Sequence, residues 1–191
     1  GRGVFSSVVK ARDTKDGRNS HVAIKVTRHN DMMKKAAEKE VSTLLRLNRA
    51  DKEHHKDVIR LLRTFEYRGH FCLVFECMAD NMRVAVKKHT KGKGMTLRAL
   101  LKFAKQLLGA LEHIHSCELI HADIKPDNIL LSADQNRAKI CDLGSALDVS
   151  EVEATPYVVS RYYRAPEIVL GMKFGTKADV FALGATLYEF F

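Results

Sequence analysis

The first part of the chain is a series of short apolar runs separated by polar turns. Apolar residues at positions 4–9 and the β-branched run at 22–26 predict two strands, with a turn at residues 13–17 between them. Two further runs, at 58–66 and 71–76, predict a hairpin. This part of the chain is therefore expected to be mainly β.

One helical segment interrupts these strands. Between Asp31 and Leu47, apolar residues recur at the spacing of a helix face, and Asp31 is placed to cap the first turn. Glu40 lies on this apolar stripe, three positions after Ala37 and four before Leu44. The pattern thus predicts a carboxylate on the buried side of the helix.

The hydrophobic pattern becomes helical in the second part of the chain. Residues 97–115 follow the helical period, with Thr96 placed to cap them. Another helix is predicted to begin near Thr176, with Asp179 in its first turn, where a carboxylate suits the helix dipole. Residues 78–94 include a basic stretch and predict a surface turn region.

The predicted fold class is α+β, with a β-rich first domain at residues 1–77 and a mainly helical second domain at residues 78–191. The chain has 191 residues, of which 46% are hydrophobic, and this is enough for a packed core. Its most apolar stretch is interrupted by Glu76, so no membrane span is predicted. Because the chain starts without a leader and stops inside a helical pattern, we expect a fragment truncated at both ends.

Basic residues outnumber acidic ones by 32 to 23, which gives a net charge of +9. Most of the excess lies in residues 1–77, which hold 17 basic and 10 acidic residues. A positive surface can attract nucleic acid or acidic proteins, but these basic residues are scattered and are not interleaved with aromatic residues for base stacking. A solvated face is the simpler interpretation, and direct nucleic-acid binding is not favoured.

Two glycines and one lysine in the first part are candidates for phosphate chemistry. Gly1 and Gly3 leave backbone amides free to approach phosphate oxygens, although such a pair is also common in a plain β-turn. Lys25 lies in an apolar strand, where an unpaired ammonium is costly to bury, and Glu40 is the candidate partner. A snorkelling Lys25 beside an exposed Glu40 is the alternative.

The strongest chemical signal is the series His-Ala-Asp-Ile-Lys-Pro-Asp-Asn at residues 121–128. It is followed by Asp-Leu-Gly at 142–144 and by Ala-Pro-Glu at 165–167. Asp123 can accept a hydroxyl proton, and Lys125 can neutralise charge on a transferring phosphoryl group. This combination predicts phosphoryl transfer.

Two kinds of metal site can be considered. Asn128 and Asp142 offer the hard oxygen ligands that Mg²⁺ prefers. A zinc cluster is the weaker alternative, because its first two members lie at the end of a predicted helix. Its candidate ligands are His113, His115, Cys117 and His121.

The chain resembles eukaryotic protein kinases over essentially its whole length. The loop at 155–167, Thr-Pro-Tyr-Val-Val-Ser-Arg-Tyr-Tyr-Arg-Ala-Pro-Glu, is similar to the activation loop of the CMGC group. Together with Gly-Val-Phe-Ser at 3–6 and the 121–128 series, it resembles the subfamily of pre-mRNA-processing factor 4 kinases. The resemblance implies a bilobal kinase fold, with a β-rich N-lobe and a helical C-lobe.

This resemblance also implies an activity. It predicts transfer of the γ-phosphate of ATP to serine or threonine of protein substrates, with ATP and Mg²⁺ as cofactors. It further implies splicing factors among the substrates and a nuclear location, with the cytoplasm as a second location. A pseudokinase or scaffold that binds nucleotide or splicing partners is the alternative.

Individual roles follow from the same resemblance. Lys25 would hold the α and β phosphates of ATP and pair with Glu40. Asp123 would orient or deprotonate the acceptor hydroxyl, and Lys125 would meet the γ-phosphate. Asn128 and Asp142 would ligate Mg²⁺. The other implied nucleotide-binding positions are Gly1, Gly3, Val8, Ala23, Phe75 as gatekeeper, Glu76, Met78 and Leu130.

The chain departs from the kinase pattern in its regulatory positions. Ala122 stands where most regulated kinases have an arginine that binds an activation-loop phosphate, so regulation is expected to differ. If Tyr157 is autophosphorylated, as the resemblance implies, Arg161 and Arg164 are the available partners for its phosphate. Leu143 replaces the usual phenylalanine and offers less apolar area.

Overall fold

The computed structural model describes residues 6–15, 20–152 and 160–191, which form two compact units. The first unit comprises Gly1–Lys52 and Ile59–Met78, and the second comprises Glu53–Val58 and Ala79–Phe191. Residues 53–58 therefore pack with the second unit, although the chain on both sides of them belongs to the first.

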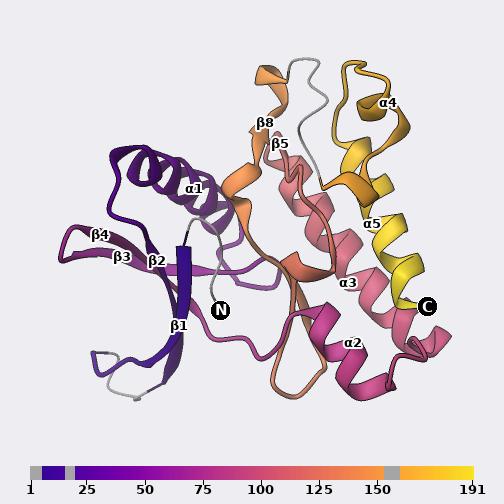
Figure 1. Ribbon diagram of the computed structural model, residues 1–191, viewed down its shortest axis with the longest axis horizontal. Coiled ribbons are helices and arrows are strands. Elements are labelled where there is room, and N and C mark those ends of the chain that lie inside the picture. Colours follow the sequence, from indigo (N-terminus) through magenta and orange to yellow (C-terminus); the bar gives the residue numbers. More distant parts are fainter. Residues whose placement is uncertain (1–5, 16–19, 153–159) are drawn as a thin grey trace. The chain divides into compact units, whose positions relative to one another are not determined.

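The first unit is built on a four-stranded antiparallel sheet with the strand order β1-β2-β4-β3 (Figure 1). The strands β2 and β4 are central, and residues 72–75 of β4 are all buried. The edge strand β3 exposes most of its side chains. It begins at Leu61, three residues after the predicted start at residue 58. Both predicted strand pairs are present. The bounds are β1 Ser6–Arg12, β2 His21–Thr27, β3 Leu61–Tyr67 and β4 His70–Glu76.

Helix α1, Asp31–Ala50, belongs to the same unit and contacts the sheet (Figure 1). Its buried face carries Glu40 together with Leu44 and Leu47, which confirms the acidic residue on the apolar stripe. The prediction that Asp31 caps the helix is wrong. The cap is Asn30, whose side-chain oxygen accepts a hydrogen bond from the Met32 amide at 2.8 Å.

The second unit contains four α-helices in its described ranges. Helix α3 confirms the prediction for residues 97–115, and the Thr96 hydroxyl accepts a hydrogen bond from the Ala99 amide at 3.3 Å. Helix α5 confirms the late helix and buries Asp179 and Phe190. The bounds are α2 Met82–Thr90, α3 Leu97–Ser116, α4 Pro166–Val169 and α5 Lys177–Phe190.

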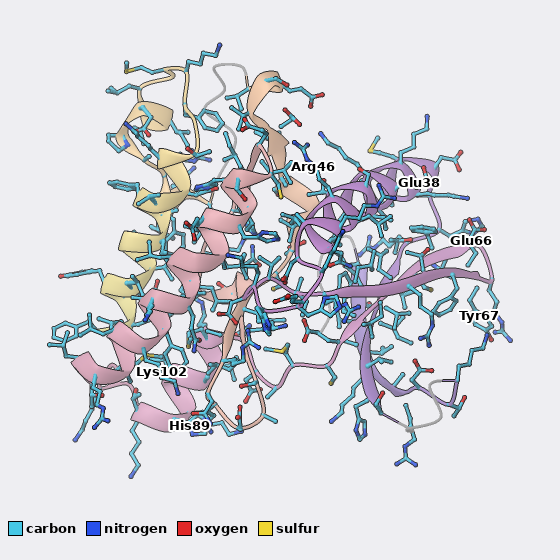
Figure 2. The ribbon with its side chains drawn as sticks, turned by 180° about the vertical axis from the view of Figure 1, so that it is seen from behind. Glu38, Arg46, Glu66, Tyr67, His89 and Lys102 are labelled. Atoms are coloured by element: carbon cyan, nitrogen blue, oxygen red, sulfur yellow. The ribbon has the colours of Figure 1, made fainter. Side chains whose placement is uncertain are left out.

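Helix α2 lies where a surface turn was predicted, so that prediction is wrong. The Asn81 side chain caps it by accepting a hydrogen bond from the Val84 amide at 2.9 Å. Of its residues, only Met82 and Ala85 are buried. Figure 2 labels the exposed His89 near the end of this helix. Helix α2 has only nine residues and buries two of them, so its apolar pattern is too short to distinguish it from a turn region.

Short strands hold the loops of the second unit. Strand β5, Leu119–Ile120, pairs with β8, Leu147–Asp148, and β6, Ile129–Leu131, pairs with β7, Ala138–Ile140. The segment 121–128 thus runs from one short strand to another. The predicted α+β class is confirmed. No helix within the described ranges is long and apolar enough to cross a bilayer.

Candidate functional site

The backbone of the 121–128 segment is fixed by a carboxylate on α5. The Asp179 carboxylate accepts hydrogen bonds from the amides of His121 at 2.8 Å and Ala122 at 2.9 Å. It also contacts Nε2 of His115 at 2.9 Å. Asp179 is buried, so these bonds replace its lost hydration. Its position in the first helical turn was predicted, but this role in anchoring the loop was not.

His121 joins the same segment to residue 141. Its ring is fully buried, and Nε2 donates to the Cys141 carbonyl at 3.0 Å while Nδ1 accepts from the Asp123 amide at 3.2 Å. These two bonds require the neutral tautomer with a proton on Nε2. The ring therefore fixes the backbone at Asp123 relative to the residue that precedes Asp142.

Asp123 is the centre of a cluster of polar side chains. Lys125 Nζ donates to its Oδ2 at 2.7 Å, and the Ser160 hydroxyl donates to its Oδ1 at 2.7 Å. Asn128 Nδ2 donates to the carbonyl oxygen of Asp123 at 2.8 Å and to its Oδ2 at 2.9 Å. Lys125 Nζ also donates to the Ser160 oxygen at 3.0 Å. The structure thus brings three predicted site residues together with an alcohol.

The contact between Ser160 and Asp123 was not predicted from the sequence. It matches the kinase loop pattern by position, but 37 residues separate it from Asp123. Only the folded second unit places its hydroxyl against the carboxylate.

Asn128 and Asp142 are brought close by the pairing of β6 with β7. In that register Ile129 lies opposite Ile140, and the Cys141 amide donates to the carbonyl of Asn128 at 2.9 Å. Asp142 is exposed and has a left-handed backbone, with φ 63°. The amide nitrogen of Asn128 is engaged with Asp123. Its amide oxygen and the Asp142 carboxylate are hard oxygen donors, the chemical type that suits Mg²⁺.

No zinc site is found in the part of the chain that the structure describes. No three His, Cys, Asp or Glu side chains gather there in a geometry suited to a metal ion. His115 contacts Asp179, and His121 bonds to a backbone carbonyl. These histidines have structural roles.

In the first unit, Lys25 on β2 pairs with Glu40 on α1. The Lys25 ammonium donates to both oxygens of the Glu40 carboxylate at 2.8 Å. The Lys25 side chain is 20% exposed and that of Glu40 is 5% exposed. The alternative of a snorkelling lysine and an exposed glutamate is therefore wrong.

A double-mutant cycle measures this pairing. We expect Lys25→Met, Glu40→Gln and the double variant to give a coupling free energy of about 1–3 kcal/mol in urea unfolding, because the pair is largely removed from water. The matched control is the exposed pair of Lys34 and Glu66, whose side chains are 46% and 56% exposed (Glu66 is labelled in Figure 2). Its coupling should stay below about 1 kcal/mol. Equal coupling in the two pairs would contradict the expectation.

Several predicted nucleotide-binding residues share one face of the sheet with Lys25. Val8 lies opposite Lys25 in the register of β1 with β2, and Ala23 lies opposite Phe75 in that of β2 with β4. Directly opposite residues of antiparallel strands point to the same side, as do residues two apart on one strand. One face of the sheet therefore carries the side chains of Val8, Ala23, Lys25 and Phe75.

The remaining predicted residues have different surroundings. The Glu76 carboxylate accepts a hydrogen bond from the Arg60 amide at 2.9 Å. Met78 ends the first unit, and Leu130 lies in β6 of the second. Arg161 is exposed and Arg164 is half-buried. The predicted residues Gly1, Gly3 and Tyr157 lie outside the described residues.

Comparisons with known proteins agree with these features. The protein kinase domain model matches residues 1–191. The chain is 46% identical over 191 residues to the serine/threonine-protein kinase prp4 of Schizosaccharomyces pombe, covering all of this chain and 40% of that protein. It is 43% identical over 193 residues to the serine/threonine-protein kinase prpf4B of Dictyostelium discoideum, covering all of this chain and 24% of that protein.

A third relative is the putative dual specificity tyrosine-phosphorylation-regulated kinase 3 homolog of Drosophila melanogaster. It is 37% identical over 191 residues, covering 99% of this chain and 22% of that protein. The chain thus spans less than half the length of each of these relatives. The match of the family model over the full chain and the motifs around Asp123 lead to one conclusion. The chain belongs to the protein kinase family.

Proposed function

We propose that this protein is an ATP- and Mg²⁺-dependent serine/threonine kinase that phosphorylates proteins. The observation that carries the proposal is the cluster of Asp123 and Lys125 around the Ser160 hydroxyl. An aliphatic alcohol within 2.7 Å of the carboxylate supports a site that orients the hydroxyl of a serine or threonine.

The chemistry can be assigned to named atoms of this cluster. The acceptor hydroxyl oxygen forms a bond to the γ-phosphorus of ATP, the bond from that phosphorus to the β,γ-bridging oxygen breaks, and ADP leaves with the electron pair. Asp123 orients the hydroxyl and takes its proton. Lys125 places a positive charge where the transferring group gains negative charge. The products are ADP and a phosphoprotein.

Other residues would bind the nucleotide and the metal. Asn128 and Asp142 would hold Mg²⁺, which neutralises phosphate charge when it is bound. Lys25 would hold the α and β phosphates, with Glu40 fixing its ammonium. In the first unit, the sheet face that carries Val8, Ala23 and Phe75 would contact the adenine side, with Glu76 and Met78. In the second unit, Leu130 is the residue to which the resemblance assigns an adenine contact. Gly1 and Gly3 would contribute backbone amides to the phosphates.

The substrates and location are proposed from the resemblance to pre-mRNA-processing factor 4 kinases. The two relatives with the highest identities given above are named serine/threonine-protein kinases. We infer splicing factors as substrates and the nucleus as the main location. Phosphorylated Tyr157, held by Arg161 and Arg164, is the proposed regulatory state.

The test is a γ-phosphate transfer assay on the full-length protein. With labelled ATP and a mixed serine/threonine protein substrate, we expect incorporation of phosphate into serine or threonine that requires Mg²⁺ and is abolished by a chelator. An Asp142→Asn variant should need more Mg²⁺ for half-maximal transfer. Binding of ATP without any transfer would overturn the proposal in favour of a nucleotide-binding scaffold.

A further inference from the structure

Arg83 on α2 joins three other parts of the second unit through its guanidinium. Its Nε donates to the two carboxylate oxygens of Asp127 at 3.1 and 3.0 Å, and one terminal nitrogen donates to Glu189 on α5 at 2.5 Å. The other terminal nitrogen donates to the Tyr163 hydroxyl at 3.0 Å. Sequence separations of 44, 106 and 80 residues lie between Arg83 and these partners.

The partners of Arg83 also bind each other. The Tyr163 hydroxyl donates to the second carboxylate oxygen of Glu189 at 2.5 Å. Burial alone would lower the pKa of Arg83, but its hydrogen bonds to Tyr163 and Asp127 and the nearby carboxylates raise that pKa above its ordinary value. Burial, followed by the hydrogen bond to Glu189, raises the pKa of Tyr163. The four groups therefore form a guanidinium site with two carboxylates and one hydroxyl.

This guanidinium site adjoins the residues around Asp123. Asp127 follows Lys125 by two positions, and Tyr163 follows Ser160 by three. Lys125 and Ser160 both bind the Asp123 side chain. An acceptor hydroxyl at Asp123 would thus bring the neighbouring residues of a substrate chain close to Asp127 and Tyr163.

The site is open to solvent. The side chains of Arg83, Asp127 and Glu189 are 44%, 42% and 40% exposed. Two carboxylates against one guanidinium leave the site with an excess of one negative charge, and removal of Arg83 would leave two exposed carboxylates. Such a pair binds a planar guanidinium better than it binds an ammonium, because the fork of N–H donors matches carboxylate geometry.

We infer that Arg83 is a specificity-determining residue that fills a guanidinium-binding subsite beside the acceptor position. The subsite would otherwise take an arginine side chain of the protein substrate. This inference rests on the proposed function. With Arg83 in place, an arginine in the substrate should not increase substrate affinity at this subsite. That arginine would have to displace the Arg83 guanidinium, which belongs to the same chain as the two carboxylates.

The experiment compares peptide preferences of the full-length protein and its Arg83→Met variant. Serine peptides carry arginine or alanine at each of four positions on either side of the acceptor. For the unmodified protein we expect similar kcat/KM for the arginine and alanine peptides at the position that reaches the subsite. In the variant the arginine peptide should be preferred by about tenfold or more, mainly through a lower KM, since a new charge-assisted pair forms.

Matched variants separate this effect from a general change in structure or charge. Lys88→Met removes a positive charge from the same helix, where Lys88 pairs at 3.5 Å with Asp80, and should leave the arginine preference unchanged. Adding Glu189→Gln to Arg83→Met should reduce the new preference, because one carboxylate of the subsite is gone. Arg83→Gln, which keeps a polar side chain of intermediate length, repeats the test if the methionine variant folds poorly.

The outcomes distinguish the inference from the proposed function. An Arg83 variant that phosphorylates the alanine peptide but shows no arginine preference at any position overturns the inference alone. If the unmodified protein transfers no phosphate to any peptide, the proposed function fails. The dissociation constants of the same peptides, measured by fluorescence anisotropy, then report the arginine preference without catalysis, and an unchanged ratio again rejects the subsite.

Discussion

Asp123→Asn in the full-length protein should lower phosphate transfer to a serine peptide by about 100-fold or more, the range typical of a positioned base. The asparagine side chain keeps the size of aspartate and can still bond to Lys125, but it cannot take the proton of the acceptor hydroxyl. Aspartate offers two carboxylate oxygens to an acceptor hydroxyl, whereas asparagine offers one oxygen and one nitrogen. In the structure the Ser160 hydroxyl takes the place proposed for that acceptor hydroxyl. The loss should appear mainly in kcat.

The measurement needs a readout of binding and a neutral control. ATP affinity and thermal stability of the Asp123→Asn variant should stay close to those of the unmodified protein, since the carboxylate is not proposed to hold the nucleotide. Glu112→Gln removes one exposed carboxylate from α3 and should not change turnover. Unchanged turnover in the Asp123 variant would remove the assigned role of this residue.

Features encoded by neighbouring residues were predictable. Glu40 falls on the apolar stripe of α1 because helical period alone determines which residues share a face. Thr96 could be identified as a cap because capping acts within one turn. At the start of α1 the rule predicted Asp31 as the cap, but the cap is Asn30, one position earlier. Both residues have side chains that favour capping, so the rule could not separate them.

Features that depend on tertiary contacts were not predictable in the same way. Helix α2 is stabilised by its Asn81 cap and by two buried residues, and with nine residues its apolar pattern is too short to stand out in the sequence. The guanidinium site of Arg83 joins α2, α5 and two short 3-10 helices, so no local window contains its chemistry. The residues around Asp123 form a recognisable sequence motif, but the Ser160 hydroxyl comes to lie beside Asp123 only in the folded second unit.

Ala122→Arg should destabilise the second unit by about 3 kcal/mol or more, the cost of burying a charge without a partner. Ala122 is 1% exposed and packs in an apolar cluster that includes Ile120, Val152 and Ile168. Its φ of 61° is left-handed, which already disfavours a longer side chain. Most regulated kinases have arginine here. In this chain the Asp179 carboxylate binds the backbone amide of Ala122, and the side chain packs in the apolar cluster, so the family residue should not restore stability or activity.

Two comparisons make the Ala122 prediction specific. Ala122→Gly removes the left-handed strain but adds freedom to the unfolded chain, so the free energy of unfolding should change by less than about 1 kcal/mol. Ala36→Arg introduces the same side chain at an exposed position of α1 and should be nearly neutral. Urea unfolding of the three variants checks these values. Equal free energies of unfolding for Ala122→Arg and Ala36→Arg would contradict the prediction. The new guanidinium would then have to reach solvent or an anion, and the apolar packing around Ala122 would not explain the absence of the family arginine.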